Sequence, residues 1–169
     1  MDRDDAYFDK CVESVEQRLH TKPLPLQMPI GMAEDFKGVI DLLKMKAYIP
    51  EDDMGKIIDE VEIPDDLKAE AQKRHDALIE SIVETDDALL ERYFEGDEIS
   101  MEELKDAIRK ATIAKTVTPM LCGSSYKNKG VQNLLDAMVE YLPSPLDIPP
   151  IKGINPDTEQ EEERPADFN

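Results

Sequence analysis

Apolar residues recur at helical spacing near both ends of the chain. The first predicted helix is capped by Asp4 or Asp5 and ends at the break before Pro23. Its inward positions comprise Phe8, Cys11, Val12, Val15 and Leu19. Towards the other end, a buried strand over 117–122 leads through a loop into a helix that stops at Pro143. The inward positions of that helix comprise Val131, Leu134, Leu135, Met138, Val139 and Leu142.

The central region changes from strand-like to helical patterning. Extended segments are predicted over 24–30, 36–43, 45–49 and 57–63, and we expect them to pair. Three helices follow, with apolar stripes formed by Leu67, Ala71, Leu78 and Ile82, then by Leu89, Leu90, Tyr93 and Phe94, then by Leu104, Ile108 and Ala111. Gly96 ends the second helix, and Ser100 with Glu103 has the spacing of a capping box that opens the third.

These elements predict an α/β protein in three parts. Residues 1–20 and 117–145 contribute one or two strands with covering helices to a parallel sheet. Residues 21–116 form an acidic α+β insertion between them. Residues 146–169, which contain four prolines and an acidic run, are predicted to be a linker.

The charge of the chain is strongly negative, at −19 from 39 acidic and 20 basic side chains. Residues 51–110 alone carry 21 carboxylates against 8 lysines and arginines. Such a surface repels nucleic-acid backbones and anionic membranes, so a basic protein is the favoured partner. The simpler interpretation is a solvated acidic face that keeps the protein soluble.

The cysteines and histidines offer no metal or catalytic constellation. Cys11 and Cys122 lie in apolar surroundings and are too few for a disulfide framework, which indicates a reducing, cytosolic compartment. His75 falls on the apolar stripe of the long central helix and is interpreted as a core or boundary residue. No apolar run approaches the length of a membrane span, so a soluble, cytoplasmic protein is expected.

The loop after residue 122 is the strongest candidate for a ligand site. Gly123, Ser124 and Ser125 are small, so a ligand edge can approach their backbone N–H groups, and a helix start follows. The alternative is a plain connection between a strand and a helix.

Five segments together resemble the translational GTPases, and within them elongation factor G. Met-Asp-Arg at 1–3 is similar to the end of the family's Asn-Lys-Met-Asp-Arg guanine motif. Residues 123–132, Gly-Ser-Ser-Tyr-Lys-Asn-Lys-Gly-Val-Gln, resemble its Gly-Ser-Ala loop, with Ser125 where the family more often has Ala. The other similar segments are 36–42, 45–48 and 141–145.

The resemblance implies a partial P-loop-GTPase-type sheet and a guanine site. The implied guanine-binding residues are Asp2, Ser124, Ser125, Tyr126 and Lys127. A carboxylate accepts hydrogen bonds from both the ring N–H and the exocyclic amine of guanine, whereas adenine lacks these donors. GTP or GDP with Mg²⁺ is the implied cofactor of the intact protein, and none is expected on this piece.

Catalytic motifs of a GTPase are not found in the sequence. A phosphate-binding loop, Mg²⁺ ligands and a water-positioning residue cannot be assembled, so we expect no enzyme in the isolated chain and no catalytic or metal residues. The Asp-x-x-Gly matches at 35–38 and 52–55 lie inside the insertion and are interpreted as chance. Asn128-Lys129 lacks the acid that would complete a second base-reading motif.

By resemblance, the chain is the carboxyl half of the GTPase domain of a ribosomal translocase that moves tRNA and mRNA. Expected partners are the ribosome and its basic stalk protein, with Glu70, Glu80 and Glu84 as candidate docking residues and no direct DNA or membrane contact. A monomer is expected. The alternatives are an autonomous acidic protein-binding module, or part of a ribosomal-protection or release-factor GTPase.

Overall fold

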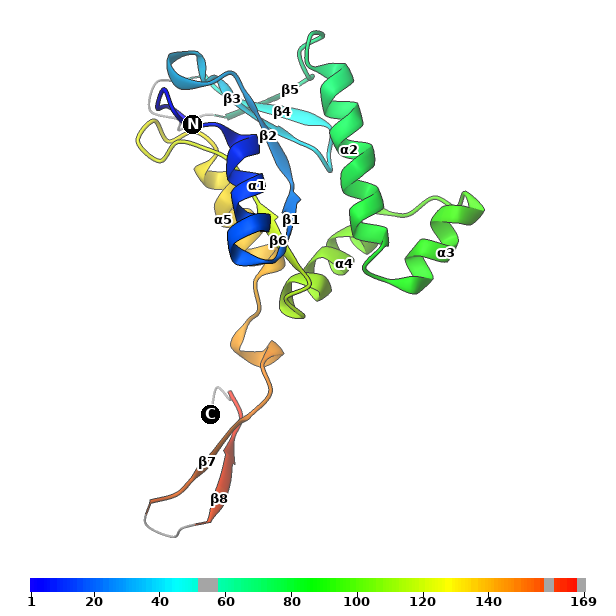
Figure 1. Ribbon diagram of the computed structural model, residues 1–169, viewed down its shortest axis with the longest axis vertical. Helices are drawn as coiled ribbons and strands as arrows, with labels where there is room; N and C mark the ends of the chain where they lie inside the picture. The colour runs from blue at the N-terminus through cyan, green and yellow to red at the C-terminus, as the bar shows by residue number, and fades with distance from the viewer. Residues whose placement is uncertain (52–57, 157–159, 167–169) are drawn as a thin grey trace.

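A computed structural model describes residues 1–51, 58–156 and 160–166. Its parallel sheet consists of two strands, β1 (Lys22–Pro25) and β6 (Val117–Met120), paired from Lys22 opposite Val117 to Pro25 opposite Met120. The flanking helices are α1 (Phe8–Leu19), α4 (Met101–Ile113) and α5 (Val131–Tyr141), as Figure 1 shows. This arrangement confirms the predicted α/β class with a small parallel sheet. Its second strand comes from the segment expected to belong to the insertion.

A four-stranded antiparallel sheet lies beside the parallel pair. Its strands run in the order β2 (Gln27–Ile30), β3 (Gly38–Asp41), β4 (Lys46–Pro50) and β5 (Ile58–Val61). The predicted pairing of the extended segments is therefore confirmed. The short 3-10 helix η1 (Ala33–Asp35) lies in the loop between β2 and β3. The Asp-x-x-Gly match at 52–55 lies outside the described residues.

In the acidic region, the structure confirms the two helix boundaries that were predicted at Gly96 and Ser100. Helix α2 (Lys68–Val83) is followed by α3 (Asp87–Glu95), whose first N–H groups bond to the side chain of Asp86. Gly96 ends α3 with φ +82°, a conformation that costs glycine little. Ser100 and Glu103 form the predicted capping box at the start of α4. Figure 1 shows α3 projecting from the body of the molecule.

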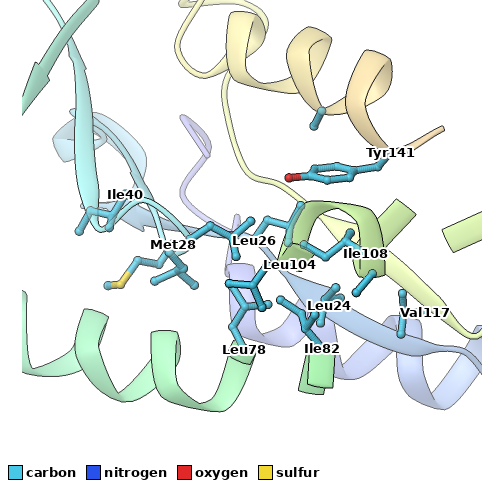
Figure 2. Packing of buried hydrophobic residues seen from close by; sticks show 14 of the residues in the cluster. Leu24, Leu26, Met28, Ile40, Leu78, Ile82, Leu104, Ile108, Val117 and Tyr141 are labelled. Carbon is cyan, nitrogen blue, oxygen red and sulfur yellow. The ribbon is translucent and has the colours of Figure 1, made fainter. Parts of the chain in front are cut away.

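One hydrophobic core joins the two sheets to the central helices (Figure 2). Leu24 of β1 and Ile40 of β3 are at most 1% exposed. Ile82 of α2 and Ile108 of α4 are equally buried against them. Leu26, between β1 and β2, links the two sheets directly. Its N–H donates to the Met120 carbonyl oxygen, and its carbonyl oxygen accepts from the Leu42 N–H. The insertion and the parallel pair are therefore packed as one body.

Helix α1 differs from the sequence-based expectation at its start and on one face. It begins at Phe8 without a side-chain cap, because the preceding residues form a turn in which Ala6 N–H donates to the Arg3 carbonyl. Phe8 is buried as predicted. Cys11 is exposed, so the expectation of a buried thiol there is wrong, whereas Cys122 is buried.

Helix α5 buries fewer of its apolar positions than its periodicity predicts. Ala137 and Tyr141 are its buried residues, and both belong to the core cluster that contains Ile108 of α4. The predicted inward positions that are exposed comprise Leu134, Leu135, Met138, Val139 and Leu142. In the described residues the parallel sheet has only two strands, and an apolar face of α5 therefore stays uncovered.

The carboxyl-terminal segment forms a hairpin where a linker was expected. After the short helix η2 (Pro145–Asp147), strands β7 (Ile151–Ile154) and β8 (Glu161–Arg164) pair antiparallel. Figure 1 shows this hairpin extending away from the rest of the molecule. Its apolar side chains Ile151 and Ile154 are exposed.

Candidate functional site

The loop that follows β6 is tightly closed. Ser124 and Lys129 exchange two backbone hydrogen bonds of 2.9 Å, so residues 125–128 form a short turn between them. Gly123 is required by this closure, because a Cβ there would lie 2.7 Å from the Lys129 carbonyl oxygen. Gly130 then adopts φ +79° and leads directly into α5. The loop therefore has a defined shape at the start of a helix.

The start of the chain lies against this loop, although 122 positions separate them in the sequence. The nitrogen of Met1 donates a 2.7 Å hydrogen bond to the carbonyl oxygen of Gly123. The Asp2 carboxylate lies near the Ser124 hydroxyl, and the interaction with this hydroxyl is the main cause that lowers the pKa of Asp2. The positive charge of Lys127 lowers the same pKa further. Asp2 is therefore held ionised beside the loop.

The five candidate guanine-binding residues do not all have the same environment. Ser124 is buried and its hydroxyl oxygen also accepts from the backbone N–H of Lys127 at 3.1 Å. Lys127 is half-buried, Ser125 is exposed, and Tyr126 is 90% exposed. The structure thus brings together Asp2, Ser124 and Lys127 and leaves the other two at the outer rim of the loop.

One detail of the predicted site is corrected by the geometry. The backbone N–H of Ser124 was expected to face a ligand, but it donates to the Lys129 carbonyl and closes the loop. Among the hydrogen bonds of the described residues, the N–H of Ser125 has no acceptor. Ser125 therefore offers the backbone donor that a ligand oxygen can use.

Two contacts of this site have no signal in the sequence. The Lys129 ammonium, which belongs to the incomplete Asn-Lys match, donates to the carbonyl oxygen of Phe36 at 2.9 Å. The Ala33 N–H donates to the carbonyl oxygen of Met1, also at 2.9 Å. Contacts of a side chain or an N–H with a distant carbonyl oxygen depend on tertiary structure, so residue patterns do not predict them.

Two of the candidate docking carboxylates lie on the exposed side of α2, and the third, Glu84, is the exposed residue that directly follows this helix. Glu70 forms an ion pair with Arg74 at 2.7 Å, and Glu84 forms one with Lys22 at the same distance. Glu80 lies between them on the helix surface and is exposed. Because Arg74 also binds Asp9 of α1 through both guanidinium branches, α2 is fixed to α1 at this point.

Neither a metal cluster nor a membrane span occurs in the part of the chain that the structure describes. No group of three or more His, Cys, Asp or Glu side chains converges there on a common point. Within the same residues, no helix combines the length and apolar character that crossing a bilayer requires. His75, expected in the core or at its boundary, is half-buried with its Nδ1 2.6 Å from the Leu42 carbonyl oxygen.

A parallel sheet with covering helices and a closed loop at a helix start beside an ionised carboxylate defines part of a GTPase-type nucleotide-binding fold. The family model of the elongation factor Tu GTP binding domain matches residues 1–144. The chain therefore belongs to this family of translational GTPases.

A solved structure is similar to this chain in sequence and fold. The crystal structure of a protein from Thermus thermophilus is 30% identical, with a TM-score of 0.74. The match covers 88% of this chain and 23% of the Thermus chain. The present chain thus spans less than a quarter of the length of that protein.

The family match corrects the expectation that the isolated chain is not an enzyme. A match over residues 1–144 to a GTP binding domain indicates a GTPase. The expectation rested on the absence of short catalytic motifs, whereas the family similarity extends over residues 1–144.

Proposed function

We propose that this chain is the carboxyl half of the GTP-binding domain of a ribosomal translocase of the elongation factor G type. In this proposal, residues 1–20 and 117–145 carry the guanine-reading end of the domain and residues 21–116 are an inserted subdomain. Residues 146–169 lead towards a following domain. The 23% coverage of the Thermus chain supports a role as one part of a longer protein.

The observation that carries this proposal is the contact between Asp2 and Ser124. It joins a carboxylate to a small-residue loop from a distant part of the sequence, as the resemblance implies for a guanine site. The carboxylate accepts from the ring N–H and the exocyclic amine of guanine. The Ser125 N–H donates to the guanine carbonyl oxygen, and the stem of Lys127 lies along the base or ribose.

In the intact protein, GTP binds with Mg²⁺ on its phosphates, and its hydrolysis drives the movement of tRNA and mRNA through the ribosome. The described residues supply the base-reading end of that site. Purine nucleoside diphosphates have the same phosphates and differ only in the base. The contribution of this end is therefore measured by comparing the affinities of diphosphates with different bases.

Competition between nucleotides tests the proposed base recognition. A fluorescent GDP derivative is bound to the protein and displaced by GDP, inosine diphosphate or ADP. Inosine diphosphate keeps the ring N–H and carbonyl but lacks the exocyclic amine, so the expected order of affinity is GDP, then inosine diphosphate, then ADP. Displacement by ADP at the same concentration as GDP would contradict the proposal.

The insertion is proposed to dock the basic stalk protein of the ribosome through the exposed side of α2. Three observations support this surface: its carboxylates Glu70, Glu80 and Glu84 are exposed, the surrounding stretch is strongly acidic, and the helix is fixed to the body by Arg74. Long-range attraction between such an acidic surface and a basic partner accelerates their encounter and is screened by salt.

Charge neutralisation on this surface tests the docking proposal. Changing Glu70, Glu80 and Glu84 to Gln together is expected to slow association with the purified stalk protein and to flatten its salt dependence. Changing residues 161–163, three glutamates of the hairpin, to Gln alters the net charge equally and serves as the matched control. Equal effects of the two triple variants would show that total charge, and not α2, governs binding.

A further inference from the structure

The loop between β2 and β3 contacts both halves of the candidate guanine site. Its Ala33 N–H donates to the Met1 carbonyl oxygen at 2.9 Å, next to Asp2. The carbonyl oxygen of Phe36, three residues on, accepts from the Lys129 ammonium at 2.9 Å. One bond thus reaches the carboxylate side of the site and the other reaches the side of the loop after β6.

A small apolar cluster lies beneath these two bonds. The Phe36 side chain is 1% exposed and belongs to a cluster with Phe8 of α1 and Cys122, the residue before the loop. Met1 packs against the same cluster. At the end of the loop after β6, a Cβ at Gly130 would lie 3.4 Å from the side chain of Val39 in β3. The insertion therefore supports the site through packing as well as through hydrogen bonds.

Residues 31–36, which we call the clamp loop, have a constrained backbone. Gly31 has φ +77°, and a Cβ there would lie 2.1 Å from the Asp35 carbonyl oxygen. Ala33 has φ +52°, which is unfavourable for a residue with a Cβ. The loop is closed where the Lys37 N–H donates to the Ile30 carbonyl, so both of its ends are fixed by strands. Such a loop acts as a rigid support.

We propose that the clamp loop sets the spacing between Asp2 and Ser124, with Lys129 and Phe36 as positioning residues for guanine recognition. This inference rests on the proposed function, because it assigns new residues to the same site. Lys129 acts through the loop and not on the base, since its ammonium is bound to the Phe36 carbonyl on the insertion side.

The proposal has a reciprocal consequence. If the clamp loop holds the base-reading groups in place, then binding of the base must stabilise the clamp loop by the same free energy. A partner that shifts the insertion would change base affinity, and the nucleotide would change the affinity of that partner. The clamp loop is thus the contact through which the insertion and the guanine site influence each other.

The ratio of GDP affinity to inosine diphosphate affinity is the most selective readout. The two nucleotides have the same phosphates, so a general loss of stability or of phosphate contacts leaves their ratio unchanged. Replacing Lys129 by Met removes a charge-assisted hydrogen bond, and we expect the ratio to fall by about five- to tenfold. The Lys129→Arg variant keeps a donor and is expected to restore most of it. Lys37→Met, at an exposed lysine directly after the clamp loop, is the matched control and should leave the ratio unchanged.

Amide hydrogen exchange without nucleotide provides the second readout. Lys129→Met is expected to accelerate exchange at Ala33, Ser124 and Lys129 together, whereas Lys37→Met is not. If the wild-type protein shows no preference between the two nucleotides, the proposed guanine site fails. Hydrogen exchange alone then tests whether the clamp loop holds Asp2 and Ser124 in place. An unchanged ratio in Lys129→Met, or unchanged exchange at these three amides, would overturn the inference.

Discussion

Replacing Asp2 by Asn should change which purine the site prefers. A carboxylate presents only acceptors, which suits the ring N–H and the exocyclic amine of guanine. The amide of an Asn side chain presents one acceptor and one donor. Xanthine keeps the ring N–H but has a carbonyl oxygen in place of the amine, so it matches the amide. We therefore expect the Asp2→Asn variant to prefer xanthosine diphosphate over GDP.

The size of the change follows from the surroundings of Asp2. Its carboxylate lies near the Ser124 hydroxyl and the positive charge of Lys127, and both lower its pKa, so it is ionised before a ligand binds. Losing one charge-assisted hydrogen bond, and leaving the guanine amine facing another donor, weakens GDP binding by about ten- to a hundredfold. The loop is closed by the backbone hydrogen bonds between Ser124 and Lys129, so it keeps its position in the Asp2→Asn variant.

Competition between GDP and xanthosine diphosphate measures this change directly. Asp4→Asn is the matched control, because Asp4 is exposed and carries the same charge two residues away. The wild-type protein and the Asp4 variant should both favour GDP, and only the Asp2 variant should reverse the order. An equal loss of affinity for both nucleotides would contradict this role, since Asp2 would then support the loop without reading the base.

Three further substitutions probe the fold. Ile40→Ala removes a fully buried side chain and should cost about 2–5 kcal/mol of unfolding free energy in urea, whereas a near-zero cost would contradict the packing. Hydrogen bonds, first from Arg92, lower the pKa of Glu103 from 4.5 to about 2, so its stabilising effect is complete above pH 4.5 and is lost as pH falls towards 2. Urea unfolding across this range should show that loss in wild type and Glu102→Gln but not in Glu103→Gln. Identical pH profiles in the three proteins would show that ionised Glu103 does not stabilise the fold. Gly123→Ala places a Cβ 2.7 Å from the Lys129 carbonyl oxygen and should speed amide exchange across the loop, which unchanged rates would disprove.

The helices were predictable because their signals are local. Apolar periodicity and boundary residues such as Gly96 and Ser100 act within one or two turns, and they specify where a helix begins or ends. The apolar face of α5 was predicted with the same signal, but its burial was not. Periodicity shows that a face is apolar, whereas burial depends on which other elements cover it.

The strand arrangement was less accessible to sequence reasoning. The segment over 24–30 has one continuous extended pattern, yet it divides at Leu26 between a parallel and an antiparallel sheet. That division depends on hydrogen bonds to Met120 and Leu42, far away in the sequence. A local pattern contains no information about such partners.

The candidate site shows the same limit. The contact of Asp2 with Ser124 was expected only through the family resemblance, because more than a hundred positions separate the two residues. The residue pattern gave no indication of the hydrogen bond from Lys129 to the Phe36 carbonyl oxygen. Sequence reasoning thus found the residues proposed to face the base and missed those that support them.

The most direct test of the guanine site is an NMR titration of the nitrogen-labelled chain with GDP and, separately, with ADP. We predict that GDP shifts the backbone signals of Asp2 and of residues 124–127 together, while ADP at equal concentration leaves them in place. Signals that move equally with both nucleotides, or that move with GDP only outside these two segments, would show that Asp2 and the loop after β6 do not read the base.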